Sequence, residues 1–194
     1  NKTIHQVFEE AAKLWLSAPF LISPQNKYKN QIEISYIEAL NLSNLYAEKL
    51  MECGYGLGQR ISVLLGNTPQ HYIVKLALNR IGISCVPLNP DSHPTEIAYI
   101  INHSQSILII TDQNWKSLIQ KSCLESKTKV KSILLDSFFS ELPLSVAVKA
   151  AGHITPNTES SLLYTSGTTG KPKGCILSNE YELMCGQSYC NIGA

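Results

Sequence analysis

Residues 164–174 read Tyr-Thr-Ser-Gly-Thr-Thr-Gly-Lys-Pro-Lys-Gly, a run rich in glycine, hydroxyl and lysine side chains. Glycine allows positive φ angles and lets backbone N–H groups approach an anion closely, and we expect this of Gly167, Gly170 and Gly174. Hydroxyls add hydrogen-bond donors, and lysines add positive charge. The run is therefore predicted to bind a polyphosphate, through Thr165, Ser166, Gly167, Thr168, Thr169, Gly170, Lys171 and Lys173.

The residues around this loop predict its local geometry. Pro172 lacks a backbone donor and disfavours helical dihedrals at Lys171, so the chain should leave the loop extended. A P-loop of the Walker type would instead continue as a helix. The apolar stretches 161–164 and 175–177 indicate short buried strands. A flexible Ser/Thr/Gly linker is the alternative, but it needs neither flanking strands nor a Lys-Pro-Lys.

Further toward the N-terminus, a capping box predicts the start of a helix. Ser35 can cap the first turn, and Glu38 can reach back to the Ser35 backbone. Apolar residues then recur at spacings of three and four, and Gly54 supplies a stop. The apolar face is expected to comprise Ala39, Leu42, Tyr46 and Leu50.

Strands and helices alternate through the middle of the chain. Thr68 should cap, and Pro69 should open, a second helix, and Pro94 should open a third. Strands are expected at 61–65, 83–86, 106–111 and 131–135, with a short helix at 115–121. This alternation predicts the α/β class, with a mostly parallel sheet covered by helices on both faces. Residues 136–158 break the pattern and indicate a connection leading to the loop.

The glycine cluster at 54–58, Gly-Tyr-Gly-Leu-Gly, invites a dinucleotide-binding interpretation. The dinucleotide fingerprint follows a strand and opens a helix, whereas this cluster follows a helix and precedes a strand. We therefore expect a turn without a cofactor.

The composition of the 194 residues excludes several classes of function. Hydrophobic residues make up 44% and charged residues 16%, which is typical of a folded soluble protein. A net charge of +1 without a basic stripe is not suited to a nucleic-acid backbone, so no nucleic-acid partner is expected. The sequence shows no apolar run of the ~20 residues that a membrane span needs and no signal-peptide pattern, so a cytoplasmic location is expected.

The cysteines and histidines indicate no metal site. The six cysteines form no Cys-x-x-Cys pair and have no histidine at zinc-finger spacing, so buried, reduced thiols are expected. The five histidines lie apart from one another in the sequence, and we assign them no chemistry.

The loop run, together with the order of the elements before it, resembles the adenylate-forming (AMP-binding) superfamily. This superfamily includes acyl-CoA synthetases, the adenylation domains of peptide synthetases and firefly luciferase. The capping-box helix, Asn67 before a proline-led helix, the passage 81–88 and the strand at 107–110 follow the family's order. Gln59 departs from the family's turn, where aspartate is usual, and this departure concerns turn geometry. The resemblance covers the whole chain and implies the N-terminal portion of such an enzyme.

The resemblance also implies a reaction and its co-substrates. A small carboxylic acid would attack the α-phosphate of ATP, with Mg²⁺, and the acyl group would then pass from acyl-AMP to a thiol. Residues 174–181 and 186–189 look most like an acyl-CoA ligase of the carnitine or crotonobetaine type, with CoA as acceptor. We assign no catalytic residue and no metal ligand, because the family's Mg²⁺ carboxylate, ribose-binding aspartate and catalytic lysine would lie beyond Ala194.

Two other functions stay open at this stage. One is an aminoacyl-adenylating domain of a peptide synthetase, and the other is a phosphate-binding module without turnover. We expect the chain to be a piece of a longer enzyme of acyl or fatty acid metabolism, and to be inactive by itself. We also expect residues 1–158 to form an N-terminal α/β subdomain and residues 159–194 to form the loop strands and a following helix. The oligomeric state is left open.

Overall fold

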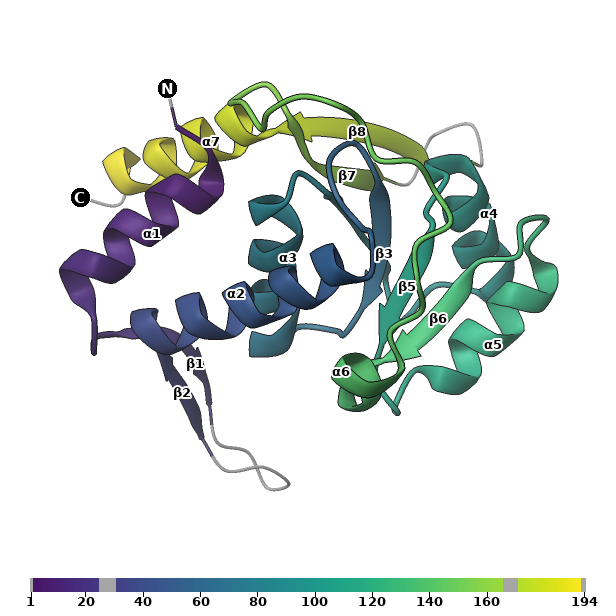
Figure 1. Ribbon diagram of the computed structural model, residues 1–194. Coiled ribbons are helices and arrows are strands. Elements are labelled where there is room, and N and C mark those ends of the chain that lie inside the picture. The colour runs from purple at the N-terminus through teal and green to yellow at the C-terminus, as the bar shows by residue number, and fades with distance from the viewer. Residues whose placement is uncertain (1, 25–30, 166–170, 193–194) are drawn as a thin grey trace.

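The fold is built around one mixed sheet. The computed structural model describes residues 2–24, 31–165 and 171–192. Within them, six strands pair in the order β6-β5-β3-β4-β7-β8, parallel throughout except for the antiparallel pair β7–β8 (Figure 1). The strands are β3 (Arg60–Leu64), β4 (Ser84–Pro87), β5 (Leu108–Thr111), β6 (Lys131–Leu134), β7 (Glu159–Thr165) and β8 (Lys173–Ser178). The predicted strands are therefore all present, with ends that shift by a few residues.

Helices cover both faces of the parallel strands, as predicted. Side chains alternate along β3, so that Ile61 and Val63 enter one apolar cluster and Leu64 enters the other. The first cluster is covered by α2 (Tyr36–Glu52), α3 (Pro69–Arg80) and the short α6 (Phe138–Glu141), and the second by α4 (Pro94–Ser104) and α5 (Lys116–Glu125). The α/β fold class is confirmed. No helix among the described residues is long and apolar enough to cross a membrane.

A smaller N-terminal layer packs beside the sheet. It contains α1 (Ile4–Trp15) and an antiparallel pair, β1 (Pro19–Ser23) with β2 (Ile32–Ser35). A third apolar cluster, centred on Phe8, Ala39 and Leu76, joins this layer to α2 and α3. The last helix, α7 (Asn179–Ile192), lies alongside α1 (Figure 1), and the Ile4 amide donates to Asn179 Oδ1 at 3.0 Å.

The capping box at the start of α2 is confirmed, but the predicted buried face is partly wrong. Ser35 and Glu38 make both reciprocal cap contacts. Leu42 is 38% exposed, whereas Ser43 points inward and its hydroxyl donates to the Leu40 carbonyl at 2.9 Å. A small polar side chain that bonds within its own helix can occupy a close helix contact, and hydrophobic periodicity alone does not find it. The buried residues of α2 are Ala39, Leu40, Ser43, Ala47 and Leu50.

Helix α3 begins at Pro69 as predicted, but Thr68 does not cap it with its side chain. The Thr68 hydroxyl instead donates backward to the Leu65 carbonyl at 3.0 Å, which stabilises the turn after β3. The helix ends just before Gly82, which has a φ of 73°.

The glycine cluster at 54–58 forms the turn between α2 and β3, as expected, and the connection 136–158 packs against it. Gly54 and Gly58 have φ angles of 85° and 80°. The Gln59 side-chain amide accepts from the Gly56 N–H at 3.0 Å and donates to the Ala147 carbonyl at 2.8 Å. Gln59 thus joins the turn to the connection.

The connection is more ordered than its sequence indicated. It begins with a 3₁₀ turn (Leu135–Ser137) and α6, and the fully buried Phe138 enters the first apolar cluster. The aromatic contact between Phe138 and Tyr46, with centroids 4.8 Å apart, fixes α6 against α2.

Candidate phosphate-binding site

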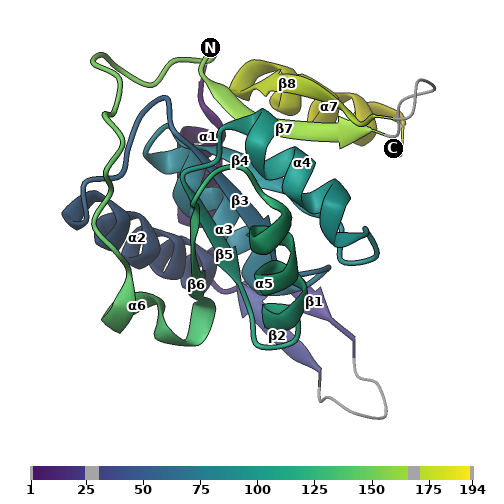
Figure 2. The ribbon, with the colours of Figure 1, turned by 90° about the vertical axis from the view of Figure 1, so that its right-hand side faces the viewer.

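The predicted strand, loop, strand arrangement is confirmed. Strands β7 and β8 form an antiparallel pair on either side of residues 166–172, and Thr165 and Lys173 are Cα partners in its last register pair. Figure 2 shows this pair lying across one side of the sheet, beside α4. The two ends of the loop are therefore held one strand spacing apart.

The structure describes three of the eight residues that are predicted to bind phosphate. Thr165, Lys171 and Lys173 are exposed, so each has access to a ligand. Because Thr165 and Lys173 are partners, the structure brings a hydroxyl and an ammonium-bearing side chain together at the base of the loop. The other five candidates lie outside the described residues: Ser166, Gly167, Thr168, Thr169 and Gly170.

Gly174 has a different role from the expected one. It sits inside β8, opposite Tyr164, and does not have the positive φ expected of it. A Cβ placed there would lie 3.1 Å from Leu162 Cδ1 and 3.3 Å from Tyr164 Cζ. A side chain there would need these neighbours to move by a few tenths of an ångström, so glycine leaves room for Leu162 and the Tyr164 ring.

The base of the loop lies at an unusual edge of the sheet for an α/β protein. Tyr164 contacts His103 in the last turn of α4, and α4 leads directly into the start of β5. The loop base is therefore near the amino ends of the parallel strands. Ligands of open α/β sheets usually bind at the carboxyl ends.

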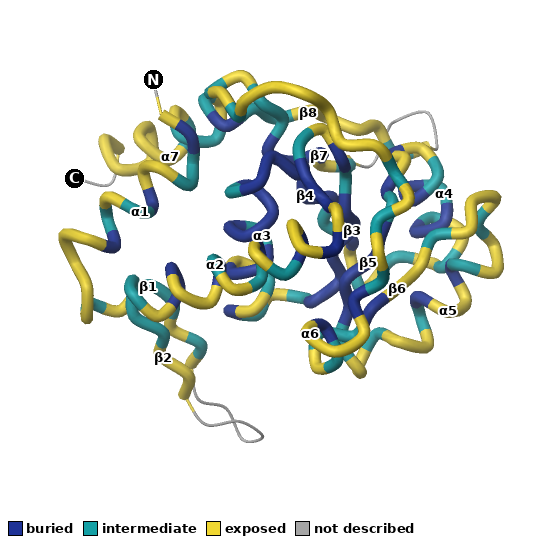
Figure 3. The backbone as a smooth tube through the Cα atoms, viewed as in Figure 1, coloured by how far each residue is buried: buried dark blue, intermediate teal, exposed yellow. Residues whose placement is uncertain are grey.

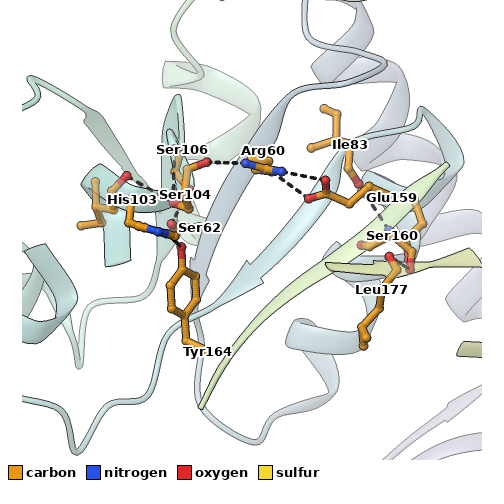
Figure 4. A network of polar contacts seen from close by, with 12 residues as sticks. Arg60, Ser62, Ile83, His103, Ser104, Ser106, Glu159, Ser160, Tyr164 and Leu177 are labelled. Carbon is orange, nitrogen blue, oxygen red and sulfur yellow. Dashed lines mark hydrogen bonds and ion pairs between the residues drawn. The ribbon is translucent and has the colours of Figure 1, made fainter. Parts of the chain in front are cut away.

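An ion pair fixes the start of β7 to β3 across the intervening strand β4 (Figure 4). Arg60 donates from Nε to Glu159 Oε1 at 2.7 Å and from Nη2 to Glu159 Oε2 at 2.8 Å. Its third nitrogen, Nη1, donates to the Ser104 carbonyl at 3.2 Å. These contacts with Glu159 raise the pKa of Arg60 above its ordinary value. The fork geometry makes this a directional contact as well as a charged one.

Buried hydroxyls continue this network beneath the ion pair (Figure 4). The Ser62 hydroxyl donates to Ser106 Oγ at 2.7 Å, and the Ser104 and Ser106 hydroxyls are 2.8 Å apart. The chain of hydroxyls satisfies polar groups that would otherwise be costly to bury. It joins β3 to the turn between α4 and β5, close to the loop base.

A tyrosine and a histidine form a second contact near the loop (Figure 4). The Tyr164 hydroxyl and His103 Nδ1 are hydrogen-bonded at 2.7 Å, and the His103 ring stacks on Tyr99 with centroids 5.4 Å apart. Burial, with the nearby Tyr99, raises the pKa of Tyr164 to about 12, so its hydroxyl stays protonated at neutral pH. Sequence reasoning assigned no role to either partner, because they are 61 residues apart.

A third polar contact anchors the helix that follows β8. Lys75 Nζ on α3 lies 2.8 Å from Glu182 Oε2 on α7, and the Ser160 hydroxyl donates to Glu182 Oε1 at 2.7 Å. Burial by itself would raise the pKa of Glu182, but the Lys75 ammonium and the hydrogen bonds lower it below its ordinary value. The carboxylate therefore stays ionised at neutral pH, although its side chain is only 22% exposed.

The prediction that the thiols are buried is only partly correct. All six cysteines are free, and Cys53 and Cys85 are buried as expected. Cys175 on β8 and Cys190 on α7 are exposed, because these two elements have little covering them among the described residues. The apolar run 175–177 indicated a buried strand without revealing which elements would cover it.

The described ends of the loop suit an anion better than a metal. Thr165 offers a hydroxyl, and Lys171 and Lys173 offer ammonium groups, which are phosphate donors. Mg²⁺ takes oxygen ligands, usually one or two carboxylates together with phosphates and water. No group of three His, Cys, Asp or Glu side chains suited to a metal gathers within residues 2–24, 31–165 and 171–192. The described residues therefore do not fit Mg²⁺, and we derive no step through it.

Comparison with known proteins identifies a family that matches nearly the whole chain. The family described as AMP-binding enzyme matches residues 8–191. The chain is 29% identical over 188 residues to the sulfoacetate–CoA ligase of Cupriavidus necator, covering 91% of this chain and 36% of the relative. It is 26% identical to the crotonobetaine/carnitine–CoA ligase of a Proteus species, covering 96% and 38%. It is also 30% identical to tyrocidine synthase 2 of Brevibacillus parabrevis, covering 93% and 5%.

Solved structures show the same fold. A Mycobacterium tuberculosis fatty acyl CoA synthetase superposes with a TM-score of 0.75 at 21% identity, covering 92% of this chain and 35% of that one. The N-terminal domain of FACL13 from the same organism superposes with a TM-score of 0.77 at 23% identity, covering 93% and 45%. The chain spans about a third of the length of the curated CoA ligases it matches. On the match over residues 8–191, the chain belongs to the AMP-binding enzyme family of adenylate-forming proteins.

Proposed function

We propose that this chain forms the N-terminal part of an ATP-dependent, AMP-forming acyl-CoA ligase. The enzyme would activate a small carboxylic acid as acyl-AMP and transfer the acyl group to CoA. The observation that carries the proposal is the loop base, where Thr165 and Lys173 are held as partners beside a run of glycines and hydroxyls. The likeness to two CoA ligases supports the choice of acceptor.

The chemistry explains why such a loop is needed. An anionic carboxylate must approach an anionic polyphosphate, so the phosphates have to be neutralised and oriented before attack. Thr165 would donate its hydroxyl to a phosphate oxygen, and Lys173 would supply positive charge from the opposite strand. Charge would then accumulate on the departing pyrophosphate, and both groups would stabilise it. Lys171, nearer to the middle of the loop, would add a second ammonium.

A second function has a specific observation in its favour. Tyrocidine synthase 2 is 30% identical to this chain, as similar as the CoA ligases are. In an aminoacyl-adenylating domain, the same loop would serve the first half-reaction, and a carrier-protein thiol would replace CoA in the second. The acyl acceptor distinguishes the two proposals. A cytoplasmic location and the boundary after Thr158 remain parts of the proposal.

The proposal predicts that replacing Lys173 or Thr165 by Ala impairs adenylation without unfolding the protein. Each variant of the proposed full-length enzyme should lose about ten- to a hundredfold in the rate of acid-dependent pyrophosphate–ATP exchange, since one contact to phosphate is lost. Both side chains are exposed, so the unfolding temperature should stay unchanged. The matched control is Lys116→Ala, which removes an exposed lysine at the start of α5, near the opposite edge of the sheet.

The outcomes separate the loop assignment from general effects on the fold. Exchange at the wild-type rate in Lys173→Ala and Thr165→Ala would contradict the assignment, as would a loss that follows lowered stability. The chain of 194 residues by itself is expected to show no exchange above a blank, and exchange by it would contradict the proposal that further residues are required. An acyl-transfer assay decides between the two proposals. Transfer to CoA would support the ligase, and transfer to a carrier protein would support the peptide synthetase.

A further inference from the structure

We infer that His103 is a positioning residue for the phosphate loop, and that it acts through Tyr164. The pair fixes the base of the loop to the end of α4. This inference rests on the proposed function, because it concerns the loop that would hold the phosphates of ATP. It assigns a role to a histidine and a tyrosine hydroxyl that the phosphate chemistry itself does not use.

The loop base needs support that the sheet does not supply. The register of β7 with β4 consists of the pair Cys85 and Ser161, near the start of β7. From Leu162 to Thr165 the register partners of β7 within the described part of the chain lie on β8. Strand β8 is itself largely exposed. A pair of strands with few other partners is marginally stable by itself, so its position relative to the core depends on side-chain contacts.

Tyr164 supplies such a contact on both of its sides. Its ring packs over Gly174 of β8, where an added Cβ would lie 3.3 Å from Cζ. Its hydroxyl bonds to His103 Nδ1 at 2.7 Å, and the two rings meet edge to face at 83° with centroids 5.7 Å apart. Tyr164 therefore holds both strands of the loop base and connects them to α4.

His103 is itself exposed, but it lies in the last turn of a well-anchored helix. Helix α4 is anchored in the second apolar cluster by Ile97 and Ile101, which are fully buried. The imidazole is also held by the stacked Tyr99 ring. A hydrogen bond from Tyr164 to His103 therefore restrains the loop base relative to the core.

The contact is one residue away from two of the three described candidate donors. Thr165 follows Tyr164 directly, and Lys173 precedes Gly174. A tilt of the Tyr164–Gly174 pair would move the hydroxyl and the ammonium together, away from the phosphates. Small displacements of groups that position a substrate are costly to binding and catalysis. Loss of the hydrogen bond should thus weaken ATP binding while the rest of the fold stays intact.

Native-state proteolysis of the 194-residue chain measures this restraint without any catalytic assay. Trypsin cuts after Lys173 only when the loop base opens, so the cleavage rate reports local opening. Tyr164→Phe and His103→Leu should each raise that rate about threefold to tenfold, the effect of losing one hydrogen bond. The double variant should cleave no faster than the faster single variant, because both changes remove the same contact. His103→Asn, which places an acceptor near the position of Nδ1, should restore a rate close to that of the wild type.

Two controls accompany the proteolysis. Tyr189→Phe makes the same chemical change at a 78% exposed position on α7 and should not alter cleavage. Cleavage after Lys149, in the exposed connection, should be the same in every variant. Equal acceleration at Lys149 and Lys173 would indicate general destabilisation and would overturn the inference. The inference would also be overturned if the double variant showed the product of the two single increases in cleavage rate. A wild-type cleavage rate in both single variants would overturn it as well.

A kinetic measurement in the proposed full-length enzyme completes the test. Tyr164→Phe and His103→Leu should raise the KM for ATP in pyrophosphate exchange about threefold to tenfold, with kcat largely retained, since the chemical groups remain. An unchanged KM in an active enzyme would overturn the positioning role. If the wild-type enzyme shows no acid-dependent exchange while the proteolysis behaves as expected, the proposed function fails and the His103–Tyr164 restraint stands.

Discussion

Strands β3 and β8 belong to one sheet but are held by different forces. The four residues Ile61 to Leu64 of β3 are buried, with helices on both faces, whereas the first four residues of β8 are exposed (Figure 3). Ile176 in β8 is 61% exposed, and Ile61 in β3 is fully buried. Parallel strands inside an α/β sheet are stabilised mainly by apolar burial. The β7–β8 pair lacks much of that stabilisation among the described residues.

Polar side chains connect β7 and α7 to the core, where fewer apolar residues are buried. The Arg60–Glu159, His103–Tyr164 and Lys75–Glu182 contacts each join β7 or α7 to a core element. These contacts are directional and few, so they set position more than they supply bulk stability. Segments that handle ligands are commonly drawn from the less stable parts of a fold. The comparison indicates that apolar burial fixes the parallel core, whereas polar contacts join β7 and α7 to it.

The largest expected effect tests the stability difference between the two strands. Ile61→Ala leaves a cavity in the centre of the sheet and should lower the free energy of unfolding by about 2–5 kcal/mol. Ile176→Ala makes the same change in β8 and should alter it by less than about 0.5 kcal/mol. Urea unfolding of both variants followed by circular dichroism measures the difference. Similar losses in the two variants would mean that β8 is covered in solution and would remove the contrast.

Much of the fold follows from the sequence because its signals are local. The capping box of Ser35 and Glu38, Pro69 at the start of α3 and the glycine turn at 54–58 each act within a few residues. The inward face of α2 was less predictable. Ser43 rather than Leu42 points inward from α2. Which side chain fits there depends on how closely α2 packs on its neighbours, and that distance is a tertiary property.

The candidate site divides in the same way. The candidate donors Thr165 and Lys173 could be proposed from the run alone, since glycine, hydroxyl and lysine are contiguous there. His103 and Tyr164 could not be paired, because no local pattern joins residues 61 apart in the sequence. The position of the loop was also unpredictable from the fold class. The rule that places ligands at the carboxyl ends of parallel strands would have directed attention to the other edge of the sheet.

An intermediate effect is expected at the contact between Glu182 and Lys75. At neutral pH, Glu182→Gln should lower the free energy of unfolding by about 1.5 kcal/mol, because a charged hydrogen-bond acceptor is replaced by a neutral one. The pKa of Glu182 is lower in the folded protein than its ordinary value of 4.5, so folding favours the ionised form. Its contribution is thus present above pH 4.5 and disappears as the pH falls through the folded pKa.

Denaturant unfolding of the wild type and Glu182→Gln from pH 7 to pH 3 checks this sign. The difference between the two proteins should shrink toward zero at the acid end. The matched control is Glu52→Gln, at a 69% exposed carboxylate that lies 3.7 Å from Lys49, which should change the free energy by less than about 0.5 kcal/mol at any pH. A difference that grows on acidification would mean that Glu182 is protonated in the folded protein.

The smallest expected effect compares a thiol in each of the two regions. Cys175→Ser replaces an exposed side chain on β8 and should change the free energy of unfolding by less than about 0.5 kcal/mol. The same thiol should react rapidly with a disulfide reagent in the native protein. Cys85 on β4 is fully buried, and burial raises its pKa to about 12, so it should react only after unfolding. Mass spectrometry of the peptides labelled at increasing times separates the two sites. Rapid native labelling of Cys85, or protection of Cys175 equal to that of Cys85, would mean that the core and the β7–β8 pair open to solvent together, and the contrast between burial and polar contacts would not hold.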